Sequence, residues 1–564
     1  MQTPRPRLEC DFLVIGSGGG ALAAAVTAAV LGLKVIVVEK ARWFGGATAR
    51  SGGWLWLPGN RFCPPGDSEA ARIYLQGRAG PHWRPDRVDA FLAAAPRMHE
   101  FFEKRTEVRL FQVKGFWDYS SEDPGAAAGR GLMPEPCDAS ILGPLRPKLR
   151  PPLRVATLFG MMIELPEQAT FMKAGRSLSA ALFVAKRLVR HTLSVLRHGD
   201  ITRLANGGAL IARLLKSARD NGVELHTEAP ATALIPRAGG GVAGAMVTIN
   251  GVPTEIHARR GVVVATGGFN HDRKRRDVLT PWAAGVPESW DPFPSENTGD
   301  GLRMAEEVGG VVCADVSSSV ALGPLTPLAR PVGNAPMFPQ FGGRAKPGVI
   351  AVLPNGRRFV DEAKSYHVFG QALIDAWNGK PGAHAWLICD DRSYRRYGLG
   401  YAKPWPVPAG RYRRMGYLVS ANTLSDLASK CGIDANALTA TVSAFNADAA
   451  RHEDRAFGRG STRYERVMGD ADCVPNPCVA PLLRAPFHAV RVIPGALGTF
   501  AGLLTDGRAR VLDRNDQPIP GLYAAGNDLM SVFGGDYVGG GCTIGPAMTF
   551  GYLAALDAVG EEKP

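Results

Sequence analysis

The chain has 564 residues, more than one hydrophobic core usually serves, so we expect two domains. Its composition, 45% hydrophobic and 21% charged, is that of a folded soluble protein. The formal net charge of +13 favours anionic partners, but we find no helix-turn-helix, zinc-finger or RNA-binding signature, so nucleic acid is not expected as a partner.

Nine cysteines are scattered along the chain with no CxxC pair and no zinc spacing. This pattern is typical of reduced thiols in a cytoplasmic protein and predicts no metal site. No stretch approaches the roughly 18 uncharged apolar residues that a membrane span needs. The N-terminal sequence MQTPRPRLECDFLVIG also lacks the apolar core of a signal peptide.

The first predicted elements form a dinucleotide-binding βαβ unit. Strand DFLVI (11–15) leads into GSGGGA, where Gly16, Gly18 and Ala21 have GxGxxA spacing, and an alanine-rich helix follows. The next strand, KVIVVEK, carries Glu39, 23 residues after Gly16. Gly18 allows a pyrophosphate to approach the helix N-terminus, and Glu39 is placed to accept hydrogen bonds from a ribose diol. A glycine-rich turn in an unrelated α/β protein is the alternative, but it does not explain this ordered set of elements.

Later glycine-rich segments favour FAD over NAD as the cofactor. The segment ARWFGGATARSGGWLWLPGN (41–60) provides a second phosphate-side loop, and GVVVATGG (261–268) and PGLYAAGN (520–527) repeat the strand-to-glycine pattern. One FAD domain assembled from both chain ends is therefore expected. Asp300 is either a ribityl-side ligand or a helix N-cap. The residues expected to hold FAD are Gly16, Gly18, Gly19, Gly20, Ala21, Glu39, Lys40, Gly45, Gly46, Ala47, Thr48, Ser51, Gly52, Gly53, Thr266, Gly267, Gly268, Asp300, Gly526, Asn527, Thr543 and Ile544.

These segments, together with NGRRFVDEAKSYHVFGQAL and GGDYVGGGCTIGP, resemble the FAD-dependent fumarate reductase/succinate dehydrogenase flavoprotein superfamily, and within it the 3-ketosteroid dehydrogenases. The resemblance spans nearly the whole chain. It implies Δ1-dehydrogenation of a 3-ketosteroid, with an electron acceptor that the sequence does not identify.

The loop at 534–546 discriminates best within this superfamily. Fumarate reductases carry an arginine of a dicarboxylate clamp where this chain has Tyr537, and a phenol suits a neutral carbonyl instead. The resemblance implies that Tyr537 and the Gly541 N–H hold the substrate's C3 carbonyl and stabilise the developing enolate. The alternatives are a core-filling aromatic side chain for Tyr537 and a plain turn for Gly541.

The resemblance also supplies a proton acceptor. Tyr366, in SYHVF, matches the family's proton-abstracting tyrosine, and Tyr119, in FWDYSSEDPG, matches its hydrogen-bonded partner. Tyr366 as a helix tyrosine at a domain seam and Tyr119 as an ordinary loop aromatic remain the alternatives. His367 is a rival base by position, but we expect it to be a satisfied histidine, because adjacent residues on a helix point differently.

Two departures bear on the substrate. Related Δ4(5α) enzymes have a serine at the position of Gly539, so glycine here favours Δ1 chemistry. Gly540 and Asp536 also depart from the commonest residues of the family loop, and Asp536 has the potential to change the polarity of the pocket. Desaturation or enone reduction of another cyclic ketone, Δ4(5α)-dehydrogenation, and a flavin-binding protein without this catalysis therefore stay open.

The remaining organisation predicts an α/β fold: a Rossmann-like FAD-binding domain built from both chain ends, with an inserted smaller α+β catalytic (capping) domain. The expected domains are residues 1–325 and 491–564 for FAD binding and 326–490 for the cap, because the chain becomes rich in proline and glycine near 326 and PFHAVRVIPG begins a strand near 490. The active site should lie at their seam.

Residues 171–198 predict a basic amphipathic helix. Leu182, Ala185, Val189, Leu193 and Leu196 fall on one face, and we expect Lys186, Arg187, Arg190 and Arg197 opposite. The helix either packs on its own domain with its basic residues in water, or lies on an anionic membrane as a peripheral contact.

Overall fold

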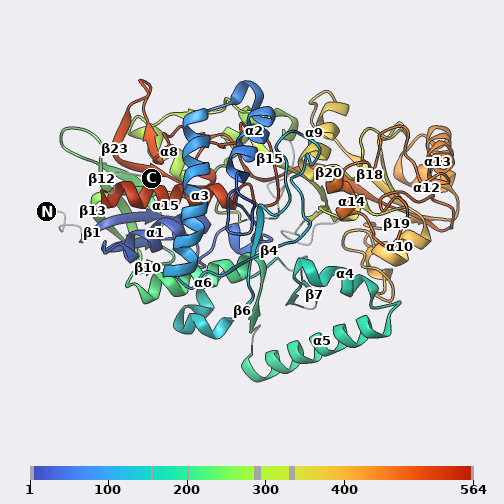
Figure 1. Cartoon of the computed structure of the whole chain (residues 1–564), viewed down its shortest axis with the longest axis horizontal. Helices are drawn as coiled ribbons and strands as arrows, with labels where there is room; N and C mark the ends of the chain where they lie inside the picture. Colours follow the sequence, from blue (N-terminus) through green and yellow to red (C-terminus); the bar gives the residue numbers. More distant parts are fainter. Residues whose placement is uncertain are drawn as a thin grey trace.

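The computed structural model describes residues 6–153, 157–158, 160–199, 202–284, 292, 294–328 and 337–560. Two large sheets organise these residues, one at each end of an elongated molecule (Figure 1). Part of the proline- and glycine-rich stretch after residue 326 lies outside the described residues.

The first sheet is built from both ends of the chain. Its parallel part has the order β10-β2-β1-β13, and β23 pairs with β13 on the other side. These strands are β1 (Arg7–Ile15), β2 (Val35–Val38), β10 (Glu224–His226), β13 (Val252–Val264) and β23 (Pro518–Ala524). Strands β12 (Val242–Ile249) and β11 (Ala231–Pro236) extend it in antiparallel fashion, and β22 (Arg510–Leu512) pairs with β23. Strand β2 and the C-terminal ends of β1, β13 and β23 are apolar and buried, as is usual for a sheet covered on both faces.

Two helices whose N-termini lie next to each other cover one face of this sheet. Helix α1 (Gly19–Val30) lies against α15 (Ile544–Val559), although they are more than 500 residues apart in sequence. Their close crossing needs glycine: a Cβ on Gly551 would lie 2.3 Å from the Gly20 carbonyl oxygen. Helices α6 (Asn206–Asp220) and α3 (Pro85–Arg105) complete the layer (Figure 1).

The second sheet has the order β16-β15-β20-β18-β17, with β19 also paired to β20. Its strands are β15 (Val320–Thr326), β16 (Phe338–Pro339), β17 (Val349–Val352), β18 (Ala385–Cys389), β19 (Val419–Ala421) and β20 (Phe487–Thr499). Helices α9 (Tyr366–Ala376), α10 (Asp391–Tyr397), α12 (Leu424–Cys431), α13 (Ala435–Ala449) and α14 (Arg463–Met468) surround it. We call this sheet and its helices the cap.

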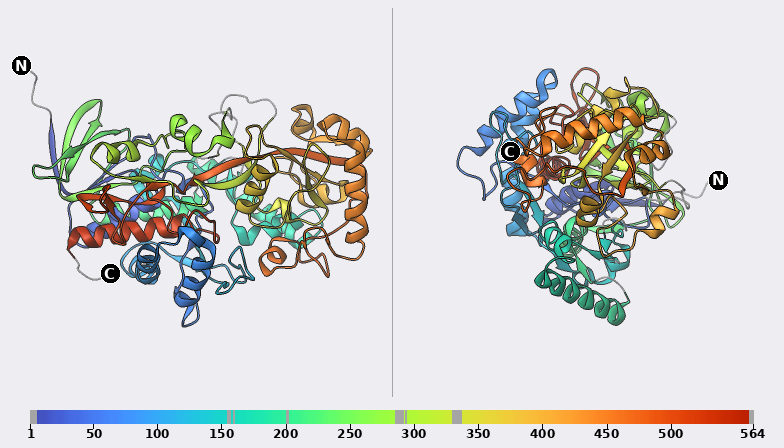
Figure 2. Two further views of the ribbon diagram at one scale, coloured as in Figure 1. Left: turned by 90° about the horizontal axis from the view of Figure 1, so that it is seen from above. Right: turned by 90° about the vertical axis from the view of Figure 1, so that its right-hand side faces the viewer.

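The expected α/β class with an FAD-type domain from both chain ends is confirmed. The expected domain limits, however, fall inside strands. Residue 326 ends β15, and residue 490 lies in the middle of β20, which pairs with β15 and runs lengthwise from the cap towards the first sheet (Figure 2, left). The change in composition near 326 coincides with the end of β15, and the domain limits stay a prediction.

A third group of elements lies beside the seam. Strands β3 (Leu55–Trp56), β5 (Gly131–Pro134) and β4 (Leu110–Gln112) form a small sheet. Helices α4 (Leu165–Lys173) and α5 (Leu178–His198) form a hairpin at the lower edge in Figure 1. The single helix expected over 171–198 is therefore divided, because Gly175 and the N-cap Ser177 separate the two helices. Among the described helices, none is both long and apolar enough to span a bilayer.

Candidate active site

A continuous cavity of about 1240 Å³ runs along the seam between the two large sheets. Its wall includes the turn after β1, the N-termini of α1 and α15, the small sheet, the α4–α5 hairpin and the cap. Pockets for one small ligand are usually about 300–1,000 Å³. This cavity is therefore large enough for a cofactor and a substrate together.

The turn between β1 and α1 is shaped for an anion. Gly16 has φ +112°, and a Cβ there would lie 2.2 Å from the Ala265 carbonyl oxygen. The N-cap Gly18 offers no side-chain acceptor, and the first turn of α1 has no acidic residue. The Gly19 N–H donates to the Thr48 hydroxyl (3.1 Å), which brings the second glycine loop against this helix end. The helix N-terminus is thus open to a phosphate group.

Glu39 lies at the end of β2, as expected for a ribose-binding acid. The Ser17 hydroxyl donates to Oε2 at 2.5 Å, and the Ala41 N–H donates to Oε1 at 2.8 Å. Burial raises the pKa of Glu39, and the Ser17 hydrogen bond opposes that rise. Both oxygens are held in place and keep lone pairs for further donors.

Most residues expected to bind FAD line the cavity, and two do not. Gly45 packs on Ala49 and Ile211, and Gly268 donates its N–H to buried Asp528 (2.9 Å). The residues in the wall are Gly16, Gly18, Gly19, Gly20, Ala21, Glu39, Lys40, Gly46, Ala47, Thr48, Ser51, Gly52, Gly53, Thr266, Gly267, Asp300, Gly526, Asn527, Thr543 and Ile544. Within this set, Asp300 begins α8 (Asp300–Glu307) and pairs with Lys40 at 2.6 Å.

The three tyrosines singled out in the sequence meet in one cluster. The Tyr119 hydroxyl donates to the Tyr366 hydroxyl (3.1 Å), and the rings of Tyr366 and Tyr537 lie 4.8 Å apart. The Tyr119 and Tyr537 rings are stacked at 5.8 Å. Each is about 91% buried and each lines the cavity. Residues that lie more than 170 positions apart in sequence thus present three phenols to one space.

Burial sets the protonation of this cluster. Desolvation raises the pKa of Tyr119, Tyr366 and Tyr537 above the usual value for a phenol. All three are therefore neutral hydroxyls at physiological pH and able to donate hydrogen bonds. Tyr366 must therefore lose its own proton before it acts as a proton acceptor, and the Tyr119 hydroxyl already donates to its oxygen.

Gly541 is held where only glycine fits. It has φ +94°, and a Cβ would lie 2.5 Å from the Leu55 N and the Trp54 carbonyl. Its carbonyl accepts from the Trp56 N–H (3.1 Å), while its N–H has no acceptor among the described residues. Gly541 lines the cavity together with Tyr537, so its N–H is available to a ligand.

A buried ionic cluster fixes Tyr119 and this loop to each other. Asp118 accepts from Trp56 Nε1 (2.7 Å) and Arg130 Nη1 (2.6 Å), and Arg130 also pairs with Asp67. The Tyr119 N–H donates to the Val538 carbonyl (3.0 Å). Burial raises the pKa of Asp118 to about 6, although Arg130 opposes the rise. The cluster orients two walls of the site and makes no contact with the tyrosine hydroxyls.

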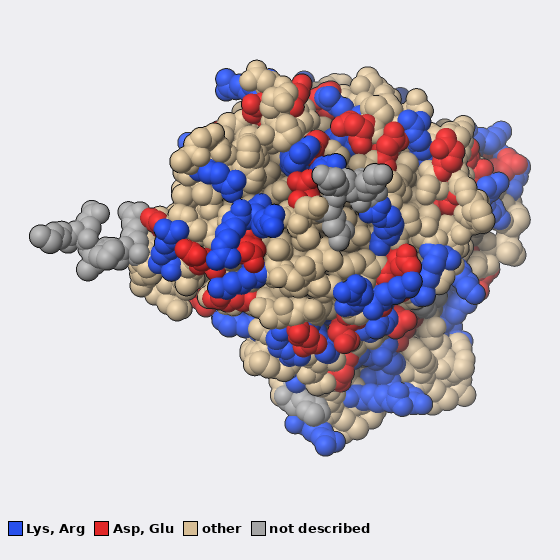
Figure 3. All heavy atoms as spheres, turned by 60° about the vertical axis from the view of Figure 1, so that its left-hand side comes forward, with Lys and Arg blue, Asp and Glu red and all other residues tan. Residues whose placement is uncertain are grey.

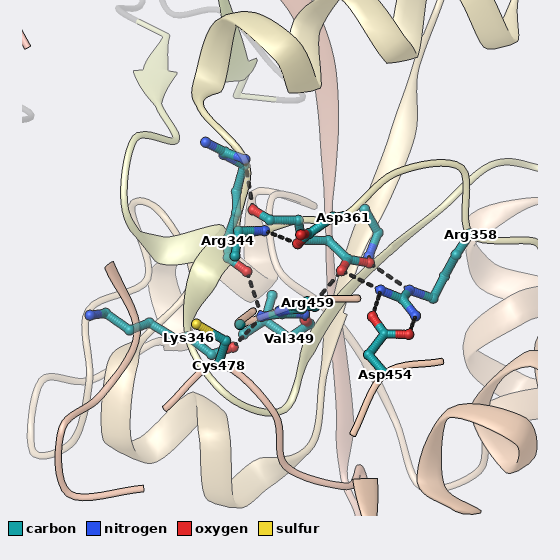
Figure 4. Close-up of polar contacts among 12 residues, drawn as sticks. Arg344, Lys346, Val349, Arg358, Asp361, Asp454, Arg459 and Cys478 are labelled. Atoms are coloured by element: carbon teal, nitrogen blue, oxygen red, sulfur yellow. Dashed lines mark hydrogen bonds and ion pairs between the residues drawn. The ribbon is translucent and has the colours of Figure 1, made fainter. Parts of the chain in front are cut away.

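A second buried network fixes the segment before Tyr366 (Figure 4). Arg358 pairs with Glu362 and Asp454 at 2.7 Å each, and Arg459 pairs with Glu362 at 3.0 Å. Arg344 donates to the carbonyls of Glu362 (2.8 Å) and Lys364 (3.2 Å). Burial alone would raise the pKa of Glu362, but the guanidinium groups, Arg358 first, hold it below its usual value. Residues 361–365 are therefore rigid where they deliver Tyr366.

His367 and Asp536, the sequence neighbours of the expected catalytic residues Tyr366 and Tyr537, interact with other groups. His367 accepts from the Leu322 N–H through Nδ1 (3.1 Å), and burial lowers its pKa to about 4, so it is neutral. Asp536 pairs with Arg78 at 2.6 Å, outside the ring contacts of Tyr537.

Sequence reasoning did not find three aromatic residues that also line the cavity. Tyr464 packs on Tyr119 (4.7 Å between ring centroids), Phe341 packs on Tyr366 (5.0 Å), and Trp54 packs on Phe116 (4.6 Å). None belongs to a glycine motif. Only Trp54 could have been identified from sequence as a residue of the site, because it directly follows Gly52–Gly53.

Comparisons with known proteins agree over nearly the whole chain. Residues 11–544 match the family model described as FAD binding domain. The chain is 40% identical to 4-oxocyclohex-2-ene-1-carboxylate 5-dehydrogenase of Sinomonas cyclohexanicum, covering 98% of this chain and 94% of that protein. It is 36% identical to 3-oxosteroid 1-dehydrogenase of Mycobacterium tuberculosis, covering 97% and 98%.

A solved structure is also similar to this chain over nearly its whole length. The 3-ketosteroid Δ1-dehydrogenase from Sterolibacterium denitrificans, in complex with 1,4-androstadiene-3,17-dione, superposes with a TM-score of 0.91 at 34% identity, covering 98% of this chain and 100% of that one.

Proposed function

The chain belongs to the FAD-dependent oxidoreductases acting on CH–CH bonds, with the 3-oxosteroid 1-dehydrogenases, and on that premise we propose that it desaturates the C1–C2 bond of a 3-ketosteroid. The observation that carries the proposal is the meeting of Tyr119, Tyr366 and Tyr537 beside the free N–H of Gly541 in one buried cavity. A relative with the same overall structure holds a Δ1,4-dienone.

FAD is the cofactor, and the residues of this cavity fit it. The open N-terminus of α1 would hold the pyrophosphate and Glu39 the ribose, and the cavity continues from there to the tyrosines. When bound, FAD supplies a hydride acceptor at the flavin N5. We assign the adenine side to the Glu39 region and the flavin side to the segment around Gly52–Gly53 and Thr543.

The protein's own groups prepare the substrate. Tyr537 O–H and Gly541 N–H donate to the C3 carbonyl oxygen, which makes the C2 hydrogen acidic. Tyr366, once deprotonated, takes that hydrogen as a proton, while the Tyr119 hydroxyl donates a hydrogen bond to the Tyr366 oxygen. The C1 hydrogen departs with both electrons as hydride, so the steroid is oxidised by two electrons. An external electron acceptor, which the sequence does not identify, would finally take up these two electrons.

The packing at Gly539 supports desaturation at the Δ1 position rather than at the Δ4(5α) position. A Cβ on this residue would lie 2.7 Å from Trp56 Nε1 and Cδ1. The serine that Δ4(5α) relatives carry here would therefore displace Trp56, which supports the Δ1 alternative.

A smaller cyclic ketone is the second candidate substrate. The relative at 40% identity is named for a carboxylated cyclohexenone. The cavity wall includes a half-buried lysine, Lys403, suited to an acid group, and this observation favours the candidate.

Anaerobic mixing with a panel of 3-ketosteroids and cyclohexanones tests the proposal. We expect a 3-oxo-4-ene steroid to bleach the flavin absorbance and to yield the 1,4-diene by mass spectrometry. A flavin that no ketone bleaches would instead identify a flavin-binding protein without this catalysis.

Glu39→Gln should weaken FAD binding by about tenfold or more, because hydrogen bonds to a charged acceptor contribute about 1.5–3 kcal/mol each. Equilibrium dialysis with flavin fluorescence measures this effect. Glu228→Gln, at an exposed position, is the control and should bind FAD like the wild type. Equal affinities of the Glu39 variant and the control would remove Glu39 from the ribose site.

We also propose that α5 holds the protein against an anionic membrane. The stripe Leu178, Leu182, Val189, Leu193 and Leu196 is 57–78% exposed, so the apolar face is not packed on the domain. Lys186, Arg190 and Arg197 flank this stripe rather than oppose it, and Arg187 turns inward to pair with Glu167. The helix has no acidic residue, and the lowest part of the molecule in Figure 3 shows mainly basic and uncharged side chains. An apolar stripe with basic flanks is typical of an interfacial helix.

The inner side of the same helix supports this orientation. Ala181, Val184 and Leu188 line the cavity, so a substrate dissolved in the bilayer would reach the site beside α5. Leu182→Glu/Leu193→Glu should reduce co-sedimentation with phosphatidylglycerol vesicles at least tenfold, since burying each leucine contributes about 1.5–3 kcal/mol. Val278→Glu, another exposed apolar position, is the control. Failure of the wild type to bind vesicles, or a lipid-free dimer that the double substitution disrupts, would contradict the membrane assignment.

A further inference from the structure

A half-buried lysine with no carboxylate partner among the described residues lies in the part of the cavity wall that the cap contributes. Lys403 follows α10, and its ammonium lies 4.7 Å from the centroid of the Phe338 ring. Its backbone is anchored, because the Tyr394 hydroxyl donates to the Lys403 carbonyl (3.4 Å). Burial lowers the pKa of Lys403, and no charged group of the described residues offsets that effect. A cation in this state stabilises the fold little.

The other lysines in the described part of the cavity wall either have polar partners or are exposed to solvent. Lys40 pairs with Asp300 (2.6 Å) and Lys173 with Asp472 (3.1 Å). Lys346 donates to the carbonyls of Met468 (2.8 Å) and Gly469 (2.6 Å), and Lys114 is exposed. Within the described part of the wall, Lys403 is thus the half-buried lysine for which the structure shows no side-chain hydrogen bond or ion pair, only the contact with the Phe338 ring.

Lys403 is also within reach of the reacting end. Phe338 contacts Lys403, and Phe341, three residues further on, contacts the Tyr366 ring at 5.0 Å. Three residues span at most about 10 Å between Cα atoms. A substrate held by Tyr537 and Tyr366 would therefore meet the lysine if it extended along residues 338–341.

We propose that Lys403 receives the carboxylate of a keto acid whose acid group lies at the end remote from the reacting carbonyl. This inference rests on the ketone desaturation proposed above and adds the substrate's second anchor. An ammonium–carboxylate contact at a half-buried position in a cavity is stronger than at the open surface. It would also give this cation a charged partner that it lacks among the described residues. A carboxylated cyclohexanone and a steroid acid share this chemistry and differ in length.

Two acid–ester pairs test the proposal and separate the two sources. The probes are 4-oxocyclohexanecarboxylate and 3-oxochol-4-en-24-oic acid, each compared with its methyl ester, on the FAD-loaded protein. We expect the wild type to prefer one acid over its ester at least tenfold in kcat/KM. In Lys403→Met that ratio should fall at least tenfold, and Lys403→Arg should restore most of it. Lys380→Met, an exposed lysine of the cap, is the matched control and should keep the wild-type ratio.

Equilibrium binding, followed through the flavin absorbance shift, is measured beside anaerobic flavin bleaching. Acids that bind in a Lys403-dependent way without bleaching the flavin would refute the desaturase function and leave the anion site standing. Ketones that bleach the flavin with no acid preference, or an acid preference that survives Lys403→Met, would overturn the anion site alone. The pair that shows the preference identifies the source, short or steroidal.

Discussion

Replacing Tyr537 by phenylalanine is expected to lower kcat by about 10²–10³-fold while FAD stays bound. The substitution removes one of two donors to the substrate carbonyl, and losing one such donor costs about 2.7–4 kcal/mol of barrier. Tyr537 makes ring contacts with Tyr119, Tyr366 and Phe500, and phenylalanine preserves these contacts. The effect should therefore appear in kcat, measured with an artificial acceptor, more than in thermal stability.

Tyr523→Phe provides the matched control. Its hydroxyl donates to Asp557 (2.9 Å), outside the cavity, so this variant also loses a partly buried phenol but should keep its turnover. Near-normal rates in Tyr537→Phe would show that the phenol only fills space. Equal losses in both variants would point to general destabilisation.

Much of the cofactor site could be predicted from sequence because its determinants are local. The turn at Gly16, the open end of α1 and the acid at Glu39 follow from about 25 consecutive residues. Rules based on neighbouring residues work in this segment, because a side chain at Gly16 or Gly20 would collide with nearby backbone. Gly45 and Gly268 fit the same motifs but pack against the interior, a difference that depends on contacts with Ile211 and Asp528 far along the chain.

The cap and its contacts could not be predicted in this way. Asp118 meets Arg130 and Trp56 only because the small sheet folds against the loop at 538–541. Lys403 belongs to no sequence motif, and spacing along the chain does not reveal that none of the described acidic residues lies beside it. The apolar stripe of α5 was visible in sequence, but whether it faces protein or solvent depends on the packing of α4.

Replacing Tyr366 by phenylalanine should lower kcat/KM by about 10²–10⁴-fold, the usual contribution of a positioned proton acceptor. The pH profile gives the sharper test. Only deprotonated Tyr366 accepts the C2 hydrogen, and burial raises its pKa above the usual phenol value near 10. In the wild type, log kcat/KM should therefore rise with pH through the alkaline range without reaching a plateau, and Tyr366→Phe should be flat there.

His367→Gln is the decisive comparison, because His367 is the neighbouring rival base. Burial lowers the pKa of His367 to about 4, and its Nδ1 is occupied by the Leu322 N–H. A histidine base would thus titrate near pH 4 and leave the alkaline limb unchanged. If the wild-type rate instead levelled off above about pH 4, and His367→Gln lost the activity that Tyr366→Phe kept, the proton would pass to the imidazole. If both variants kept the alkaline rise, the base would lie outside this pair, and Tyr119 would be the next phenol to replace.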